Sequence, residues 1–238
     1  MITEAIVLAG GLGTRLKSVV ADLPKSLAPV AGKPFLAYLL DYARQEGIQK
    51  FIFALGYKTE QIEEFVKQYL PQGSYQFSVE DEPLGTGGAI FKAGKQVTVP
   101  DTIVLNADTF FGISFSHLSI IHQLRRAACT LALKPMKSFD RYGAVETDRQ
   151  VITGFSEKKY HASGLINGGV YALSVAAFLK KSFPPVFSFE KDYLEKEVRS
   201  REILGLVSDA YFIDIGIPED YQRAQNELVQ HFPSKSKA

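Results

Sequence analysis

The stretch Ala5-Ile6-Val7-Leu8-Ala9-Gly10-Gly11-Leu12-Gly13-Thr14-Arg15-Leu16, followed further along by Pro24-Lys25, decides the fold. Its apolar start predicts a buried strand. The strand breaks into three glycines within four residues, which allow a backbone to approach a ligand closely. Free N–H groups in such a loop favour anions, and Arg15 and Lys25 supply donors and charge suited to phosphate. The stretch therefore predicts a strand followed by a loop that binds a triphosphate.

Two common phosphate-binding patterns do not fit this loop. A P-loop requires G-x-x-x-x-G-K-[ST], yet Gly32-Lys33 is followed by proline. A dinucleotide-binding loop requires G-x-G-x-x-G, and the third glycine is missing after Gly11 and Gly13. A plain glycine turn at the end of a strand is the remaining alternative.

Composition limits the class of protein. A chain of 238 residues can bury an ample core as one large domain or two small ones, and its 46% hydrophobic content is ordinary for a globular protein. The net charge of +1 argues against nucleic acid as a partner, so phosphate affinity must be local. The single cysteine, Cys129, excludes a disulfide framework, and its apolar surroundings predict a buried, inert thiol. Without a signal peptide or spanning segment, we expect a cytoplasmic protein that has no membrane partner.

Periodicity along the chain predicts an α/β fold. Helices are expected from Pro34 to about Gly47 and from Thr59 to Tyr69, and strands at 51–55 and 75–79. This alternation implies a parallel sheet with helices on both faces, and ligands then bind beyond the carboxyl ends of its strands. A further helix is expected to begin at Pro218.

An acidic segment rich in glycine, Glu80-Asp81-Glu82-Pro83-Leu84-Gly85-Thr86-Gly87-Gly88-Ala89, follows the third predicted strand. Its glycines would let a base or ribose lie against the backbone. The alternative is a helix-entry loop whose acids favour the helix N-terminus.

Two aspartates are candidate metal ligands. Asp108 follows the apolar strand 103–106, where it suits Mg²⁺, although a turn or cap residue is the common role of such an aspartate. Asp214 lies in the apolar run 211–217, and a buried carboxylate there needs a metal, an arginine or a backbone cap.

From Arg141 the pattern changes to that of antiparallel strands, the first expected over 141–145. The next strand ends in Glu157-Lys158, which would accept sugar hydroxyls and hold a sugar phosphate, or would form an ordinary solvated pair. Asn167-Gly168 supplies an amide beside glycines, suited to hydroxyl recognition, and its alternative is a plain Asn-Gly turn.

These strings resemble the signatures of the sugar-1-phosphate nucleotidyltransferases: G-G-x-G-T-R-L…P-K at 10–25, E-P-L-G-T-[AG]-G at 82–88, N-[GA]-D at 106–108 and [WF]-x-D-I-G-[TV]-P-E-D-Y at 212–221. Ala107 departs mildly from the usual glycine. The resemblance implies a Rossmann-like, mixed and mainly parallel sheet with helices on both faces. It also implies one domain over 1–232, with a nucleotide half of about 1–135, a sugar-phosphate half of about 136–232 and a polar tail over 233–238. No hexapeptide repeat follows, so the acyltransferase part of the bifunctional members is not expected.

The resemblance also implies the site residues and their roles. Catalysis would fall to Arg15, Lys25 and Asp108, and Mg²⁺ would lie between Asp108 and Asp214. The nucleotide site would comprise Leu8, Ala9, Gly10, Gly11, Gly13, Thr14, Glu82, Pro83, Gly85, Thr86 and Gly87. The sugar-phosphate site would comprise Tyr142, Gly143, Glu157, Lys158, Asn167 and Gly168. The substrates would be a nucleoside triphosphate and a sugar 1-phosphate.

A finer resemblance concerns the base and the sugar. Strings such as Phe139-Asp140-Arg141-Tyr142-Gly143 and Phe187-Ser188-Phe189-Glu190 resemble the heptose 1-phosphate guanylyltransferases, which implies GTP and D-glycero-α-D-manno-heptose 1-phosphate. Independently, an acceptor-only carboxylate at Glu82 or Asp81 favours guanine, which has donors at both N1 and N2. Mannose 1-phosphate, a uridylyl- or thymidylyltransferase, and a non-catalytic sensor are the alternatives. The sequence leaves open whether the chain forms a homo-oligomer.

Overall fold

The computed structural model describes residues 1–11, 23–56 and 59–232. The first half alternates strands and helices: β1 (Glu4–Leu8), η2 (Lys25–Leu27), β2 (Pro29–Val30), β3 (Lys33–Pro34), α1 (Phe35–Gln45), β4 (Lys50–Leu55), α2 (Thr59–Tyr69), β5 (Tyr75–Val79), α3 (Gly85–Gly94), β6 (Asp101–Asn106), β7 (Thr109–Phe111) and α4 (Phe115–Leu124). The second half has longer strands: β8 (Cys129–Phe139), β9 (Ala144–Asp148), β10 (Val151–Phe155), β11 (His161–Ser174), α5 (Val175–Leu179), η3 (Phe189–Leu194), α6 (Glu195–Glu197), η4 (Val198–Ser200), β12 (Ile203–Val207), β13 (Phe212–Asp214) and α7 (Pro218–His231).

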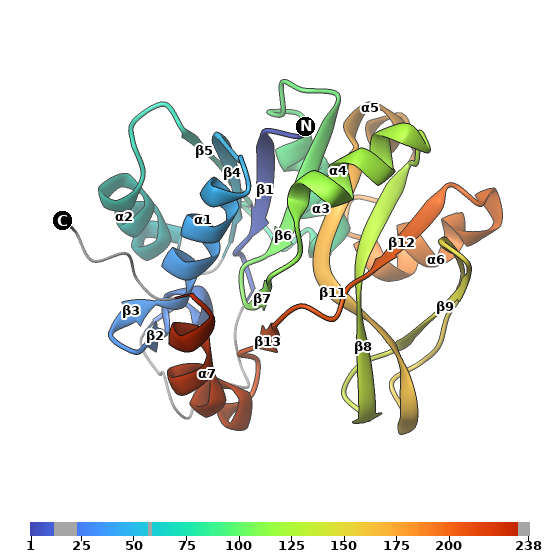
Figure 1. Ribbon diagram of the computed structural model, residues 1–238. Coiled ribbons are helices and arrows are strands. Elements are labelled where there is room, and N and C mark those ends of the chain that lie inside the picture. The colour runs from blue at the N-terminus through green and yellow to red at the C-terminus, as the bar shows by residue number, and fades with distance from the viewer. Residues whose placement is uncertain (12–22, 57–58, 233–238) are drawn as a thin grey trace.

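One nine-stranded sheet runs through both halves of the chain in the order β5-β4-β1-β6-β11-β8-β12-β10-β9 (Figure 1). The first four strands in this order are parallel, as are β8 and β12. The remaining pairs are antiparallel, and β9 pairs back onto β11. The sheet is therefore mixed, as predicted, and its continuous parallel part lies in the nucleotide half.

Helices cover both faces of the parallel part, because its strands are apolar on both sides. Along β1, Ala5 and Val7 face a core shared with α1, α2 and α4. Ile6 between them faces a second core shared with α3, α5 and η3. The period-2 alternation of the strand thus fixes which helices lie on which face.

Most predicted elements are confirmed. Pro34 immediately precedes α1, and Pro218 is the first residue of α7. Cys129 is fully buried, and burial raises the pKa of its thiol. The strand expected over 141–145 is wrong in its first part, because β9 begins at Ala144 and residues 141–143 form a loop instead.

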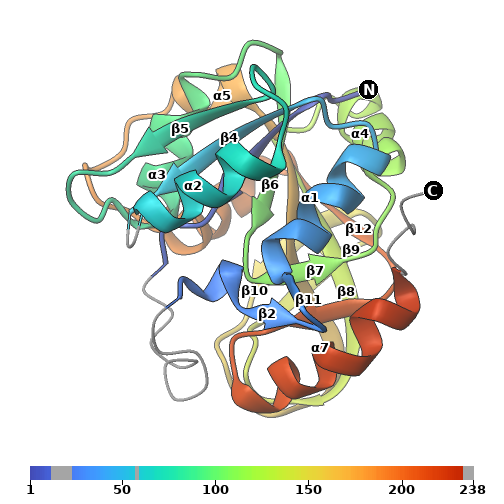
Figure 2. The ribbon, with the colours of Figure 1, turned by 90° about the vertical axis from the view of Figure 1, so that its left-hand side faces the viewer.

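A small sheet of β7 and β13 lies beside the large one and pairs Asp214 with Thr109. Behind it, α7 packs on β2 and α1 through a third core that includes Phe35, Phe110 and Ile213. Figure 2 shows α7 lying across the end of the molecule near β2 and β7. This arrangement carries the chain from the C-terminal half back to the edge where β1 and β6 end.

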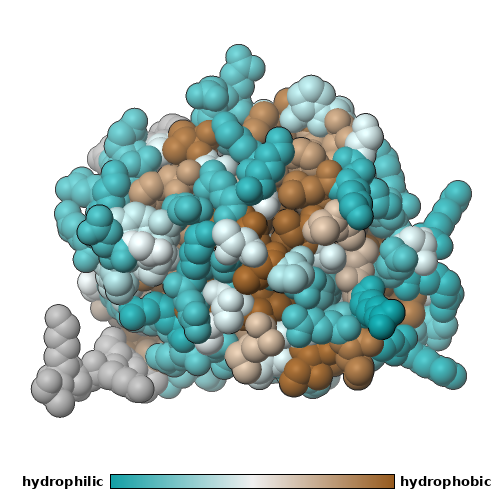
Figure 3. All heavy atoms as spheres, turned by 90° about the horizontal axis from the view of Figure 1, so that it is seen from above, coloured by the Kyte–Doolittle hydropathy of each residue, from teal (hydrophilic) through white to brown (hydrophobic). Residues whose placement is uncertain are grey.

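The surface combines polar residues with scattered apolar ones. Seen from above in Figure 3, hydrophobic residues form a band between hydrophilic ones. Among the exposed apolar side chains are Ile120 and Leu124 of α4. Within the described ranges, none of the helices has both the length and the apolar character needed to span a membrane.

Candidate functional site

A cavity of about 720 Å³ opens at the edge where the parallel strands β1, β4, β5 and β6 end. The segments that follow these four strands all contribute to it, as expected for an open α/β sheet. Its lining comprises Leu8, Ala9, Gly10, Gly11, Lys25, Ser26, Ala54, Gly56, Glu80, Asp81, Glu82, Pro83, Gly85, Thr86, Ala89, Asn106, Ala107, Asp108 and Gly216. The cavity thus joins the predicted phosphate loop, the acidic segment and the first candidate metal ligand.

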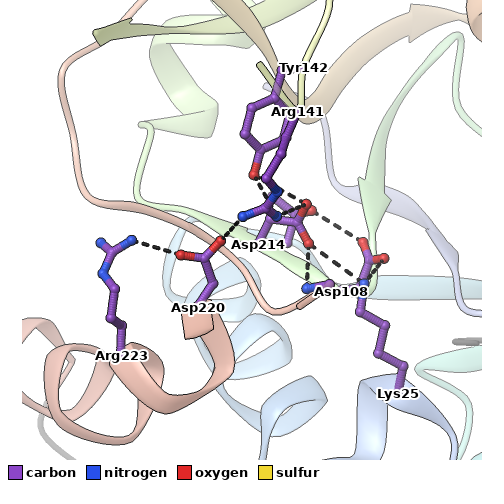
Figure 4. Close-up of polar contacts among 9 residues, drawn as sticks. Lys25, Asp108, Arg141, Tyr142, Asp214, Asp220 and Arg223 are labelled. Atoms are coloured by element: carbon purple, nitrogen blue, oxygen red, sulfur yellow. Dashed lines mark hydrogen bonds and ion pairs between the residues drawn. The ribbon is translucent and has the colours of Figure 1, made fainter. Parts of the chain in front are cut away.

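The side chain of Lys25 reaches from η2 toward Asp108 and Asp214 (Figure 4). Its Nζ is 2.6 Å from Oδ2 of Asp108 and 3.6 Å from Oδ1 of Asp214. Ser26, the next residue, is buried, and its hydroxyl has no hydrogen-bond partner within the described ranges. A cation therefore joins two carboxylates that are far apart in sequence.

The two carboxylates meet because β7, which begins directly after Asp108, is paired with β13, which ends at Asp214. Thr109, directly after Asp108, lies opposite Asp214 in the β7–β13 ladder. The N–H of Ile215 donates to the carbonyl of Asp108 at 3.0 Å. Oδ1 of Asp214 also accepts the N–H of Gly216 at 2.7 Å, so this carboxylate has the backbone cap that the sequence left as one alternative.

An outer group of polar side chains contacts Asp214 from its other side (Figure 4). Tyr142 donates its hydroxyl to Oδ2 of Asp214 at 3.3 Å, and Nη2 of Arg141 lies 3.8 Å from the same oxygen. Nη1 of Arg141 donates to Asp220 on α7, whose other oxygen accepts from Arg223 at 2.8 Å. Burial raises the pKa of Tyr142, and the charge of Asp214 raises it further, so this hydroxyl stays protonated as a donor.

Arg141 keeps its charge in this setting. Burial alone would lower the pKa of its guanidinium, but the hydrogen bond to Asp220 and the nearby charges raise it. Together with Asp214 and Tyr142 it lines a second cavity of about 380 Å³ between β8, β13 and α7. Sequence reasoning assigned no role to Arg141 or Asp220, because their relation to Asp214 depends on the packing of α7.

The predicted nucleotide residues fall into three groups. Leu8, Ala9, Gly10, Gly11, Glu82, Pro83, Gly85 and Thr86 line the large cavity, and Gly13, Thr14 and Arg15 lie outside the described residues. Gly87 is buried beneath the cavity wall, and its N–H donates to the carbonyl of Phe187 at 3.0 Å. A nucleotide contact at Gly87 therefore stays a prediction, whereas its packing against Phe187 is evident.

Glu80 is a candidate that sequence reasoning did not single out. It follows β5 directly and lines the cavity, and its Oε2 accepts the N–H of Leu84 at 3.0 Å. Asp81 and Glu82 also line the cavity, but their side chains are exposed. Of the three acids, Glu80 is the half-buried one whose carboxylate is held by the backbone. Its position at the carboxyl end of a parallel strand was the available signal.

The predicted sugar residues are less closely grouped. Asn167 is occupied within the fold, since its amide donates to the Tyr171 hydroxyl at 2.8 Å and its oxygen accepts the N–H of Gly169 at 3.0 Å. Gly143 lies in the loop before β9. Glu157 and Lys158 are exposed, and neither has an ion-pair partner among the residues that the structure describes. Gly168 lies in β11, where a Cβ would come within 2.4 Å of the Phe111 ring.

The charged centre suits a hard cation that is shared with a substrate. Asp108 and Asp214 offer carboxylate oxygens on either side of one ammonium group, and Mg²⁺ takes one or two carboxylates plus phosphate oxygens and water. Across the described ranges, no cluster of three or more His, Cys, Asp or Glu side chains could hold a metal alone. The residues present therefore fit a metal that a phosphate substrate helps to hold.

Comparisons with known proteins find relatives over nearly the whole chain. A family model described as Nucleotidyl transferase matches residues 4–231. A D-glycero-alpha-D-manno-heptose 1-phosphate guanylyltransferase of Aneurinibacillus thermoaerophilus is 49% identical over 229 residues, which cover 96% of this chain and 99% of that protein. The protein of the same name from Campylobacter jejuni is 44% identical over 219 residues, 92% of this chain and 96% of that protein.

A solved structure shows the same likeness in three dimensions. The crystal structure of HddC from Yersinia pseudotuberculosis complexed with GMP-PN superposes with a TM-score of 0.82 at 36% sequence identity. The match covers 95% of this chain and the whole of the other. The similarity therefore extends over both halves of the sheet.

Proposed function

Because this chain belongs to the nucleotidyl transferase family, we propose that it transfers GMP from GTP to D-glycero-α-D-manno-heptose 1-phosphate. The products are pyrophosphate and the corresponding GDP-heptose, a precursor for surface-glycan synthesis. Two relatives at 49% and 44% identity over nearly their full length carry the heptose 1-phosphate guanylyltransferase name, and the similar HddC structure holds GMP-PN. The observation that carries the proposal is the Lys25 ammonium between Asp108 and Asp214 at the wall of the cavity.

The reaction requires that the negative charge of the phosphates be neutralised and that the two reacting phosphate groups be aligned. An oxygen of the sugar phosphate attacks the α-phosphorus of GTP, and the bond from that phosphorus to the β-phosphate oxygen breaks. The attacking oxygen is already anionic, so no general base is needed. The site must hold two anions in line and stabilise the charge that shifts to the leaving pyrophosphate. Lys25 supplies a fixed positive charge at this edge of the cavity, and Arg15 stays a second candidate from the sequence.

The metal proposed here is Mg²⁺, held by Asp108 and Asp214. When bound, it would neutralise phosphate charge and polarise the phosphoryl oxygens. Each carboxylate keeps a fixed position without it, Asp108 through the β7–β13 pairing and Asp214 through the Gly216 N–H and the Tyr142 hydroxyl. The chain's own contribution is therefore a rigid pair of oxygen donors beside a cation.

The acidic segment supports guanine as the base. A carboxylate only accepts hydrogen bonds, and guanine presents donors at both N1 and N2, whereas uracil and thymine present one at N3. One carboxylate oxygen of Glu80, Oε2, is held by the N–H of Leu84 at 3.0 Å, which fixes the direction of the carboxylate. We assign base recognition to Glu80 ahead of Glu82 and Asp81, because a pre-positioned acceptor loses less freedom on binding.

The proposal also covers the extent of the domain, the sugar-phosphate residues and the cellular location. We assign residues 1–232 to one transferase unit, because β6 of the nucleotide half pairs with β11 of the sugar half. The proposed sugar-phosphate residues stay those expected from the sequence: Tyr142, Gly143, Glu157, Lys158, Asn167 and Gly168. The reaction is assigned to the cytoplasm, where nucleoside triphosphates are held.

A pyrophosphate-release assay tests the proposal. GTP, ATP, UTP and dTTP are each supplied with Mg²⁺ and either the heptose 1-phosphate or mannose 1-phosphate. We expect the highest kcat/KM for GTP with the heptose. A pocket that hydrogen-bonds the extra hydroxyl of heptose would reject mannose strongly, whereas one that merely has room would discriminate by about a hundredfold or less. Faster turnover of mannose 1-phosphate would overturn the sugar assignment, and GTP binding without pyrophosphate release would indicate a sensor.

A further inference from the structure

The segment Phe187–Glu190, here called the clamp, lies against the glycine turn that forms one wall of the nucleotide cavity. In Figure 2 the orange segment that follows α5 runs beside α3, which begins with this turn. The N–H of Phe187 donates to the carbonyl of Leu84, and the N–H of Gly87 donates back to the carbonyl of Phe187, both at 3.0 Å. Two backbone hydrogen bonds therefore join parts of the chain that are about a hundred residues apart.

The clamp accounts for the glycines of the turn. A Cβ on Gly85 would lie 2.5 Å from the Phe187 carbonyl oxygen, and Gly85 also has a positive φ of 73°. A Cβ on Gly87 would lie 2.3 Å from the Phe187 ring. Neither position tolerates a side chain while the clamp is in place. The contact with the clamp thus restricts which residues the turn can have.

Side chains reinforce the contact through one carboxylate. Oε2 of Glu190 accepts the hydroxyl of Thr86 at 2.8 Å and that of Ser188 at 2.9 Å. The same Thr86 oxygen accepts the N–H of Phe189 at 2.9 Å. Thr86, which lines the cavity, therefore binds the clamp through two hydrogen bonds, one as donor and one as acceptor.

The clamp is anchored in the core on its other side. Phe189 and Tyr193 are buried, and the Phe189 ring packs edge-on against Tyr171 of β11 with 5.2 Å between centroids. Phe187 stacks on Phe183 with 4.2 Å between centroids. These aromatic contacts fix the clamp independently of the turn. We therefore infer that the clamp holds the turn in place, and not that the turn holds the clamp.

We propose that Glu190 is a positioning residue for the nucleotide, acting through Thr86 to hold the turn 85–87 in the shape that receives the nucleoside. Glu190 is distinct from the groups that carry the chemistry, since its carboxylate accepts hydrogen bonds from Thr86 and Ser188 and does not line the cavity. The inference rests on the proposed function only in naming GTP as the ligand. It predicts an effect on nucleotide affinity rather than on the chemical step.

The test compares Glu190→Met, which removes the acceptor, with Glu190→Gln, which keeps one. Thr86→Val and Thr86→Ser form the matching pair at the donor, and Glu195→Met, at an exposed glutamate nearby, is the control. Calorimetry gives the Kd for GTP, turnover gives the KM for the sugar 1-phosphate, and hydrogen exchange reports the backbone of residues 84–88 without any ligand.

We expect Glu190→Met and Thr86→Val each to raise the Kd for GTP about tenfold, as loss of one charge-assisted hydrogen bond would. Exchange across 84–88 should become faster in both variants. In Glu190→Met, whose side chain lies outside the cavity lining, the KM for the sugar 1-phosphate and kcat should stay near wild-type values. Glu190→Gln should resemble wild type, and Thr86→Ser should keep the wild-type exchange across 84–88. The double variant Thr86→Val/Glu190→Met should be no worse than the weaker-binding single variant, because both remove the same contact.

Three outcomes would overturn the inference. One is unchanged exchange and GTP affinity in Glu190→Met, and another is additive losses in the double variant. The third is an equal loss of both substrates together with a lower Tm, which would indicate general destabilisation. Hydrogen exchange needs no nucleotide, so wild-type protein that fails to bind GTP would contradict the proposed function and leave the clamp to be judged by exchange.

Discussion

Replacing Lys25 with methionine tests the centre of the site most directly. The side chain of Lys25 is only 11% exposed, and its ammonium contacts Asp108 and Asp214 together. Losing one pre-positioned electrostatic group typically raises the barrier by about 3 kcal/mol, so we expect kcat to fall roughly a hundredfold or more.

The same substitution should also change how stability depends on metal. Without the ammonium, two carboxylates face each other with no cation between them. Breaking a fully buried pair costs about 3–5 kcal/mol, and because the Asp108 side chain is 41% exposed we expect a smaller loss, about 1–2 kcal/mol. Mg²⁺ can replace the missing charge, so it should stabilise Lys25→Met more than it stabilises the wild type.

Thermal unfolding with and without Mg²⁺, together with pyrophosphate release, measures both effects. Lys33→Met is the matched control, since Lys33 forms a comparable part-buried pair with Asp41, at 2.5 Å, away from the cavity. It should lose stability without losing turnover and should show the wild-type response to Mg²⁺. Turnover of Lys25→Met within tenfold of wild type, or an unchanged metal response, would refute the reasoning.

Three further predictions concern the metal, the base and pH. Asp108→Asn and Asp214→Asn should each raise the Mg²⁺ concentration needed for half-maximal activity, because an amide keeps the shape but loses the charge; full activity in excess chelator would contradict this. Glu80→Gln should lower kcat/KM for GTP about tenfold or more and so reduce the preference for GTP over UTP. Glu82→Gln should have little effect on either value. Burial lowers the pKa of His122 below its ordinary value of 6.5, so the unfolded state binds more protons there. Unfolding free energy should therefore fall as pH drops below about 6.5, and denaturation curves of His122→Gln should show a shallower fall.

Local sequence patterns were sufficient for the elements that bury one regular face. The unbroken apolar run Ala5-Ile6-Val7 predicts β1 as a buried strand, because both of its faces pack against a hydrophobic core. Pro218 predicts the start of α7 because proline suits the first turn of a helix. The carboxyl-edge rule then brings Asp108 and the first glycine loop to one cavity without knowledge of any contact.

Contacts between segments that are distant in the sequence could not be predicted from local sequence patterns. The sequence offers a ligand as the reason for Gly87 and Gly168, yet their nearest neighbours are Phe187 and Phe111, which no local pattern identifies. From the sequence the acid that recognises the base is expected at Glu82 or Asp81, because no local pattern shows that the N–H of Leu84 holds the carboxylate of Glu80. For the two glycines, the contacting residue belongs to a distant segment of the chain. For Glu80, the contact depends on the shape of the turn that follows it.

The site therefore divides into a rigid part and a part that is free to adapt. Asp108 and Asp214 are joined through the β7–β13 pairing, so they keep their spacing as one unit, and Lys25 bridges them. The proposed sugar contacts at Glu157 and Lys158 lie on an exposed loop with no such support. Phosphate chemistry shared by the whole family requires fixed charges, whereas recognition of one particular sugar can vary on a loop without disturbing them. This division explains how one sheet can keep its reaction while its substrate changes.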